Sequence, residues 1–443
     1  MSPPERTLWL SGGCLGPTNS AMLWACLGRH QRVPGQGRLQ RVLWGKSMET
    51  EDILMCPGPN EIADRVIRAM LHPAACPVYE EFQELYEQTL DMLARVFQTT
   101  NQAIPIPGSG RSGLESAITS VVERGERTLT IANGQFGELA MRIVNGIGGK
   151  GEAFSSPWGA PIDLDAFAEK LASGPYKLVT MVHNETSTGA VYQAGEIARL
   201  AHQNGALFLL DAVSSLGGAD LPMDTWDVDL AVSCNHKAIG APIGHAYVAV
   251  SNRAWEVMEK RQTPCGTIYG NLLTWKAQPD ETATGGRTLR RPQGVFSAVH
   301  LFYALHEALA MILEEGLPQR FARHELNAAA FRAGITALGL QTIAKSEVAS
   351  PTVTCVCLPD GISSQAFLHH FRQDHGLATL PGIGDYRPTV VRVGHMGVTA
   401  TPRNILHALH AFDSVLTRLG HQHDRSAAVM RAEEVYADAE AAH

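Results

Sequence analysis

The feature that most constrains the fold is a regular alternation of short apolar runs with segments of helical periodicity. Six apolar runs have the length of β-strands, at 103–106, 128–132, 177–182, 206–210, 228–233 and 245–250. Between them, apolar residues recur at helical spacing at 112–122, 136–147, 164–172 and 195–203. Strands that alternate with helices and are apolar throughout indicate a mostly parallel sheet that is covered on both faces. The sequence therefore predicts an α/β fold.

The order of elements changes in the second half of the chain. Long helical segments at 295–315 and 317–338 precede strands at 352–357 and 390–393, with a helix at 364–375 between the strands and another near 403–419. This order predicts a smaller C-terminal α+β domain. We therefore expect a large domain at 48–290, a small domain at 291–420 and a polar, Ala/Glu-rich tail at 421–443.

The first 47 residues differ in composition from the rest. They hold six Lys and Arg residues, one acidic residue and three of the seven tryptophans, among many Gly and Pro. No apolar segment with a small-residue cleavage site follows a basic start, which argues against a secretory signal. We interpret residues 1–47 as an N-terminal extension upstream of a start at Met48. A flexible arm or a transit-like segment is the alternative.

Composition and charge argue against several classes of protein. Hydrophobic residues make up 45% of the chain and charged residues 18%, which excludes a disordered or fibrous protein. A net charge of −8, from 36 Lys and Arg against 44 Asp and Glu, argues against nucleic-acid binding. No apolar stretch reaches the about 18 residues that span a bilayer. The eight cysteines form no CxxC pair. We expect a soluble, cytoplasmic protein with no metal ion and no membrane partner.

A lysine follows one of the predicted strands, in the segment SCNHKAIGAPIG at 233–244. Lys237 leaves the strand into a loop of small residues, which is a poor place for a solvated surface lysine. Its flexible stem and tunable amine suit a Schiff base. By itself, the segment is as compatible with an ordinary loop lysine.

An aspartate closes another predicted strand, in FLLDAVSSLG at 208–217. Open α/β sheets bind ligands at the carboxyl ends of their strands, where Asp211 lies. A carboxylate there suits the ring nitrogen of pyridoxal phosphate, because the pairing keeps the ring protonated and electron-withdrawing. A helix cap or a loop carboxylate is the alternative.

A Gly/Ser loop joins a strand to a helix in IPIPGSGRSGLES, at 104–116. The N–H groups of a helix N-terminus, with the hydroxyls of Ser109 and Ser112, would cradle a phosphate. The loop matches neither GxGxxG nor a Walker motif, and it is weak evidence alone. A phosphate loop, Asp211 and Lys237 in this chain order are far more specific together.

From about residue 55 to about residue 419, the chain resembles the class V, fold type I pyridoxal-phosphate aminotransferases. It is most similar to the alanine–glyoxylate, serine–pyruvate and ureidoglycine–glyoxylate subgroup. The matching segments are CPGPN (56–60), GSGRSG (108–113), NGQFGE (133–138), PWGAPID (157–163), HNETSTG (183–189), DAVSSLGG (211–218), NHKAIGAPIG (235–244), EEGLPQRFARH (314–324) and RVGHMG (392–397). The resemblance implies a large domain with a mostly parallel sheet flanked by helices, a smaller C-terminal α+β domain, pyridoxal 5'-phosphate as cofactor, and a homodimer with active sites at the interface.

The resemblance also implies roles for single residues. Lys237 resembles the Schiff-base lysine, and Asp211 the partner of the ring nitrogen. Arg392 resembles the arginine that grips the substrate's α-carboxylate through two hydrogen bonds, although a strand arginine can also serve a structural salt bridge. The other cofactor contacts that it implies are Ser109 and Gly110 at the phosphate, Phe136 and Val213 on the two faces of the ring, Thr186 near the ring, and His236 where the subgroup often has a glutamine.

Two segments differ from the family pattern. The partner-subunit segment usually resembles YHHTP, with a threonine that reaches the phosphate across the dimer, but the aligned residues here are QGVF at 293–296. Arg290, Arg291 and His236 are the candidates to supply the missing charge. The entrance segment is CPVY at 76–79, which favours a specialised substrate.

These roles predict an aminotransferase with a ping-pong mechanism, in which a donor of the alanine, serine or ureidoglycine type passes its amino group to glyoxylate or pyruvate. Free pyridoxamine is an alternative donor, because the segment at 348–362 resembles pyridoxamine–pyruvate aminotransferases. A lyase or desulfurase on the same fold is a further alternative, with Cys265 as the candidate nucleophile. Intact Lys237 and Asp211 argue against a non-catalytic binding protein.

Deletion of residues 1–47 is expected to leave turnover and Tm nearly unchanged, because this segment matches no element of the family. The measurement compares the full chain with a chain that starts at Met48. A large loss of either quantity on truncation would show that the extension belongs to the folded enzyme.

Overall fold

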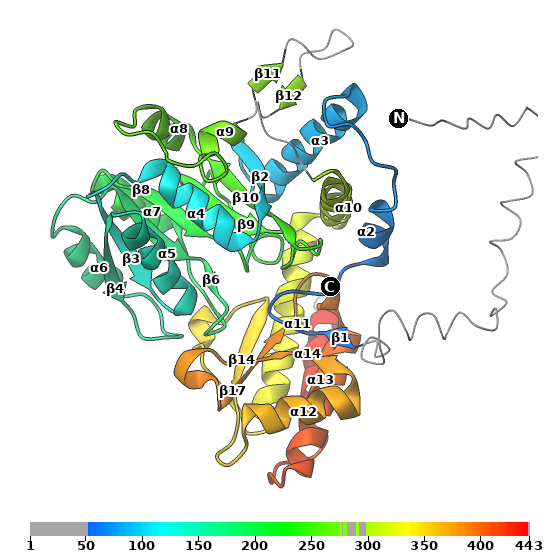
Figure 1. The fold of residues 1–443 in the computed structure, drawn as a ribbon. Coiled ribbons are helices and arrows are strands. Elements are labelled where there is room, and N and C mark those ends of the chain that lie inside the picture. The colour runs from blue at the N-terminus through cyan, green and yellow to red at the C-terminus, as the bar shows by residue number, and fades with distance from the viewer. Residues whose placement is uncertain (1–51, 277, 281–288, 292–297, 442–443) are drawn as a thin grey trace, which may run out of the picture. The chain divides into compact units, whose positions relative to one another are not determined.

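The computed structural model describes residues 52–276, 278–280, 289–291 and 298–441 (Figure 1). All of them belong to one compact unit, Asp52–His443. The predicted extension at 1–47 and the QGVF segment at 293–296 lie outside the described residues.

A seven-stranded sheet organises the first half of the described chain, with the strand order β2-β10-β9-β8-β5-β3-β4. Its strands are β2 (Gln102–Gly108), β3 (Arg127–Ala132), β4 (Lys150–Ser155), β5 (Leu178–Val182), β8 (Leu207–Asp211), β9 (Leu230–Cys234) and β10 (Gly244–Val250). All neighbours are parallel except β10, which is antiparallel to both β2 and β9. The α/β fold with a mostly parallel sheet that the sequence predicted is confirmed.

The sheet is buried on both faces, as its apolar strands require. In β8, Leu207 and Leu209 enter the core on one face, whereas Phe208 and Leu210 enter the core on the other. The first face is covered by α4 (Gly110–Val121), α5 (Gln135–Gly146) and α8 (Asn252–Glu259), and the second by α6 (Leu164–Leu171), α7 (Gly195–Gln203) and α10 (Val299–Glu315) (Figure 1). Helix α3 (Glu80–Val96) packs against α10 through a stacked pair, Tyr86 and Phe302.

The edge strand β4 was not predicted from the sequence. It pairs with β3 alone, and its residues, KGEAFS, are partly or fully exposed. A strand at the edge of a sheet needs no continuous apolar run, so the signal that identified the other six strands is absent here.

The small domain is built on an antiparallel sheet in the order β13-β14-β17-β16. Its elements are α11 (Leu317–Ala337), β13 (Gln341–Thr342), β14 (Val353–Cys357), α12 (Ser364–His375), β16 (Leu380–Pro381), β17 (Val390–Gly394) and α13 (Pro402–Arg418). The first described strand, β1 (Ile53–Leu54), pairs with β15 (Leu377–Ala378), and Met55 enters the core of this domain. Residues 53–55 therefore lie against the small domain, although the sequence assigned residues from 48 onward to the large one.

The C-terminal segment is structured where the sequence predicted only a polar tail. Residues Ala427–Ala441 form α14, which packs against α11 and α13. Ala428 and Ala432 are fully buried there. Small residues on one face let this helix lie close to its neighbours. Because the rest of the helix is polar, the sequence did not indicate this buried face. Among the described residues, no helix is long and apolar enough to cross a membrane.

Candidate functional site

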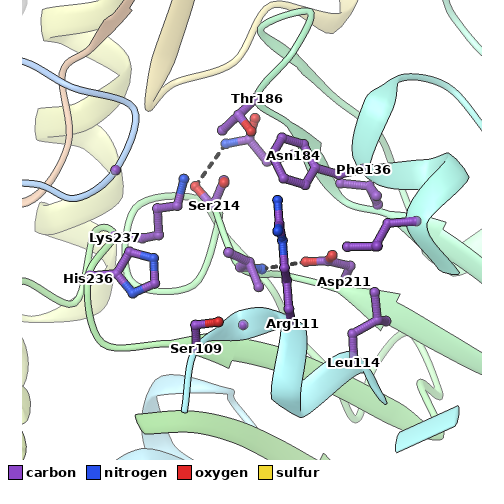
Figure 2. Close-up of a pocket in the computed structure, with 15 residues that line it drawn as sticks. Ser109, Arg111, Leu114, Phe136, Asn184, Thr186, Asp211, Ser214, His236 and Lys237 are labelled. Carbon is purple, nitrogen blue, oxygen red and sulfur yellow. Dashed lines mark hydrogen bonds between the residues drawn. The ribbon is translucent and has the colours of Figure 1, made fainter. Parts of the chain in front are cut away.

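A cavity of about 270 Å³ lies at the carboxyl ends of β5, β8 and β9 (Figure 2). Open α/β sheets bind their ligands at such strand ends. The cavity brings together eight of the residues that the sequence predicted to touch the cofactor, namely Ser109, Gly110, Phe136, Thr186, Asp211, Val213, His236 and Lys237. Their roles remain predictions, but the chain places them around one space.

Lys237 lies three residues beyond the end of β9, and only 9% of its surface is exposed. Its amine donates a hydrogen bond to the carbonyl oxygen of Pro57. Burial, with a smaller contribution from Arg392, lowers the pKa of this amine to about 8, because an ammonium ion is poorly solvated there. Such an amine is available as a nucleophile and as a base near neutral pH.

Asp211 is the last residue of β8. Its Oδ1 accepts a hydrogen bond from the N–H of Val213, at 2.9 Å. Burial raises the pKa of this carboxyl to about 7, and the nearby Glu185 adds to the rise. A cationic group bound in the cavity would stabilise the carboxylate form, so the site is suited to a protonated ring nitrogen.

The predicted phosphate loop joins β2 to α4, but the hydroxyl of Ser112 donates to Pro107 O and Ser109 O, and Ser112 does not line the cavity. Helix α4 begins at Gly110, with Ser109 as its N-cap, and the Ser109 side chain makes no capping hydrogen bond. The first N–H groups of a helix have no partner within it and attract anions. A Cβ atom on Gly110 would lie 2.5 Å from Val213 Cγ2, so only glycine allows this close approach. The N–H groups of Ser112 and Gly113 donate to Ser109 O and that of Gly110 to the Cys234 thiol, so the loop leaves the N–H of Arg111 and the hydroxyl of Ser109 for an anion.

His236, a candidate from the sequence to supply positive charge, is neutral before an anion binds beside it. Burial lowers the pKa of its imidazole to about 4, and the neighbouring Lys237 contributes in the same direction. The ring is therefore neutral at neutral pH. Its Nδ1 is buried without a hydrogen-bond partner among the described residues. The side chains of Arg290 and Arg291 lie outside the described part of the structure.

Arg392 lies on β17 of the small domain and is buried. Its Nε donates to the carbonyl oxygen of Pro381 at 2.8 Å, and its Nη1 to that of Thr186 at 3.4 Å. Neither partner is a carboxylate, so the structural salt bridge considered from the sequence is not formed with any described residue. Thr186 lines the cavity, so the guanidinium reaches its border, although Arg392 is not among the lining residues.

Several residues that line the cavity were not assigned a role from the sequence. They are Gly58, Arg111, Leu114, Leu139, Val182, Asn184 and Ser214. Asn184 donates from Nδ2 to Ser214 O and to Thr352 Oγ1, which leaves its buried Oδ1 without a partner. Gly58 has a φ of +120°, and a Cβ atom there would lie 2.5 Å from Lys237 Cε. Asn184 and Gly58 belong to two of the motifs, HNETSTG and CPGPN, and chain position alone does not reveal that they face the cavity.

Cys265, the candidate nucleophile of a desulfurase, does not line the cavity. Its Sγ contacts the carbonyl oxygen of Thr119 at 3.7 Å. In this structure it is therefore not in a position to attack a ligand beside Lys237. No group of three or more His, Cys, Asp or Glu residues in the described part of the chain could hold a metal ion.

The residues around the cavity fit pyridoxal 5'-phosphate. The N-terminus of α4, with the N–H of Arg111 and the hydroxyl of Ser109, suits its phosphate, and Val213 and Phe136 can contact the two faces of a ring. Asp211 suits the ring nitrogen, and the amine of Lys237 suits the aldehyde. Asn184 Oδ1 and His236 Nδ1, buried and unpartnered within the described chain, leave hydrogen-bonding capacity for a bound ligand.

Comparison with known proteins agrees with this fit. A family model described as aminotransferase class-V matches residues 67–394. An uncharacterised aminotransferase of Methanocaldococcus jannaschii is 34% identical, over 83% of this chain and 93% of its own. The (S)-ureidoglycine–glyoxylate transaminase of Bacillus subtilis is 30% identical, over 87% of this chain and 95% of its own. The crystal structure of pyridoxamine–pyruvate aminotransferase from Mesorhizobium loti superimposes with a TM-score of 0.81 at 28% identity, over 88% of this chain and 97% of that one.

In cofactor-free protein, we expect Lys237 to react with pyridoxal at a rate that rises with pH up to about 8 and then levels off. Only the neutral amine attacks an aldehyde, and burial brings its deprotonation down to this range, whereas an ordinary lysine titrates near about 10.4. Borohydride reduction followed by mass spectrometry of the peptide that contains Lys237 measures the rate. A rate that keeps rising to about pH 10 would mean that the amine is solvated like a surface lysine.

Proposed function

Because this chain belongs to the class-V aminotransferases, we propose that it transfers an amino group from a donor of the alanine, serine or ureidoglycine type to glyoxylate or pyruvate by a ping-pong mechanism. The enzyme is a pyridoxal-phosphate-dependent transaminase with the fold of the fold type I aminotransferases. The observation that carries the proposal is the meeting of Lys237 and Asp211, from neighbouring strand ends, in the cavity with the phosphate loop.

Each residue contributes through an ordinary physical property. Bound pyridoxal phosphate supplies an electron sink that stabilises negative charge on the substrate's α-carbon. Asp211 would pair with the ring nitrogen and keep it protonated. Lys237 would hold the cofactor through its aldehyde, and its amine would accept a proton from the substrate's α-carbon and donate a proton back to the substrate or cofactor. Its depressed pKa suits both directions of this transfer.

Arg392 is proposed to bind the α-carboxylate of donor and acceptor in turn. Two of its nitrogens are used by Pro381 O and Thr186 O, and no described residue accepts a hydrogen bond from its Nη2. The bonds to carbonyl oxygens fix the plane of the guanidinium without neutralising it. A charged group with one free edge is suited to a carboxylate.

We also propose that the protein is a cytoplasmic homodimer with its active sites at the subunit interface. Ile67, Leu71 and Tyr79, along the segment around α2 (Asp64–Ala69) and the start of α3, are large apolar side chains that are 49%, 79% and 60% exposed. Exposed apolar residues along one short segment are typical of an interface. The free thiols of all six cysteines in the described part of the chain fit a reducing compartment.

Pyridoxamine–pyruvate transamination is the second candidate. Similarity to a pyridoxamine–pyruvate transaminase, 29% identical over 83% of this chain, favours it. A solved pyridoxamine–pyruvate aminotransferase also shares the fold closely. In this alternative, free pyridoxamine is the donor and Arg392 binds a carboxylate only in the pyruvate half-reaction.

A panel of donors tests the proposed function. Alanine, serine, ureidoglycine and pyridoxamine are each offered with glyoxylate or pyruvate, and loss of the bound cofactor's visible absorbance reports the first half-reaction. We expect turnover with at least one amino acid donor and none for Lys237→Ala, which should remain folded by circular dichroism. Turnover of Lys237→Ala at a few per cent or more of the wild-type rate would remove Lys237 from the mechanism.

Arg392→Ala separates the two candidate functions. For amino acid donors, kcat/KM should fall by about two to four orders of magnitude in both half-reactions, because a carboxylate is left unpaired in a partly desolvated site. Arg392→Lys should recover little, since an ammonium cannot reproduce the two parallel hydrogen bonds. With pyridoxamine as donor, the first half-reaction should be far less affected than the second.

Arg431→Ala serves as the control for this series, because Arg431 is an exposed residue of α14 that pairs with Glu434. Its kcat/KM should equal the wild-type value. Equal kcat/KM for Arg392→Ala and the wild type in both half-reactions would mean that Arg392 only supports the fold of β17.

A further inference from the structure

A fully buried carboxylate beside the cavity has no role in the proposed function. Glu185 ends the short strand β6 (Asn184–Glu185) and lies between two residues that line the cavity, Asn184 and Thr186. None of its surface is exposed. Burying a carboxylate costs free energy unless it is well hydrogen-bonded, so its contacts indicate what it does for the fold.

Each carboxylate oxygen of Glu185 accepts two hydrogen bonds. Oε2 accepts from the N–H groups of Phe136, at 3.0 Å, and Gly137, at 3.2 Å. Oε1 accepts from the N–H of Ser187, at 2.9 Å, and from its Oγ, at 2.6 Å. The N–H of Gln135 in turn donates to Ser187 Oγ at 3.1 Å. One carboxylate therefore joins the first turn of α5 to the turn that follows β6.

Glu185 replaces the capping side chain that α5 lacks. The N-cap residue is Gly134, which has no side chain, so the first N–H groups of the helix need an acceptor from elsewhere. A Cβ atom on Gly134 would lie 2.3 Å from Glu185 Cγ, so the glutamate occupies the place of a local cap. All four groups bonded to it are donors, and a carboxylate accepts without donating. Burial raises the pKa of Glu185, but these four donors and the positive end of the helix dipole favour its charged form.

The two segments that Glu185 joins carry groups of the proposed site. Phe136, whose ring lines the cavity, donates its own N–H to the carboxylate, so the backbone that carries the ring is fixed at that point. Thr186 follows Glu185 directly, lines the cavity and accepts the hydrogen bond of Arg392 Nη1. Figure 2 shows Phe136 and Thr186 near each other at one side of the cavity.

We propose that Glu185 is a positioning residue, whose carboxylate fixes the first turn of α5 against β6 and so holds Phe136 and Thr186 in place around the cofactor. Glu185 acts through these residues and is not among those that line the cavity. The catalytic consequence rests on the proposed function, because Phe136 and Thr186 matter to turnover only if the cofactor binds there. The mechanical link between α5 and β6 does not depend on it.

Glu185→Gln tests the link with little change in shape. Glutamine offers one acceptor oxygen, and its NH₂ group would face two of the four donors. In cofactor-free protein, the amides of Phe136 and Gly137 should exchange with solvent deuterium about tenfold faster or more, since hydrogen bonds to a charged acceptor are lost. The affinity for pyridoxal phosphate, measured by absorbance titration, should fall by about tenfold or more.

A double-mutant cycle shows whether Glu185 acts through Phe136. Phe136→Leu keeps the N–H but removes the ring. If Glu185 positions that ring, the loss of cofactor affinity in the double variant should be close to the larger single loss. Two outcomes together would overturn the proposal. The losses of cofactor affinity would multiply in the double variant, and the amides at 136–137 would exchange at the wild-type rate in Glu185→Gln.

Two further variants complete the test. Glu152→Gln is the control. It alters a carboxylate on β4 that also accepts several hydrogen bonds, from Arg127, Lys170 and Tyr176, and it should leave exchange at 136–137 and cofactor affinity at wild-type values.

If Glu185→Gln does not fold, Ser187→Ala takes its place. This variant removes one donor to the carboxylate and the acceptor of Gln135 N–H, and it should speed exchange at 135–137 more modestly. Unchanged exchange in Ser187→Ala would then overturn the link. Exchange is read without cofactor, so a failed aminotransferase assay does not decide this result.

Discussion

The parallel pairing of β8 with β9 is the constraint on which the site depends. Asp211 pairs in register with Val232, and β9 continues for two residues to Cys234 before the chain turns to Lys237. A carboxyl group and an amine thus follow the carboxyl ends of two adjacent central strands, where both are largely buried. Burial then moves the two pKa values toward each other, to about 7 and about 8. An aspartate and a lysine at the same separation on the surface would keep their ordinary pKa values, and the lysine amine would then be protonated and unreactive near neutral pH.

The second domain completes the surroundings of the lysine. The segment at 55–60 runs from the small domain to the large one, and its ends are held by both. Gly394 N–H donates to Met55 O, while Asn60 N–H donates to His236 O and Asn60 Nδ2 donates to Met396 O. Between these anchors, Pro57 O accepts from the Lys237 amine. The strand that carries Arg392 and the loop that carries Lys237 are therefore linked through the segment at 55–60 by a few hydrogen bonds.

Much of this arrangement could be predicted from the sequence, because the strong signals are local. Buried parallel strands are apolar throughout, so β5, β8 and β9 were identified, and their ends indicated Asp211 and Lys237. The edge strand β4 and the helix α14 could not be identified, because each buries only part of its surface and reads as polar. Glu185 stood within a recognised motif, but its role depends on contacts with residues about fifty positions earlier in the chain. His236 shows what residue type alone does not reveal, because burial and the neighbouring Lys237 lower the pKa of its imidazole.

The pairing of β1 with β15 also sets an order of events during synthesis. Residues 53–54 find their partners only at 377–378, and Met55 O finds its donor only at Gly394. The large sheet can form from residues 102–250 as they leave the ribosome, since domains tend to fold in the order in which they are made. The segment at 55–60 has to wait for more than three hundred further residues before it can close over the lysine. A nascent chain therefore holds the amine and the carboxylate long before it holds a finished pocket, and the cofactor's full surroundings come together only at the end of translation.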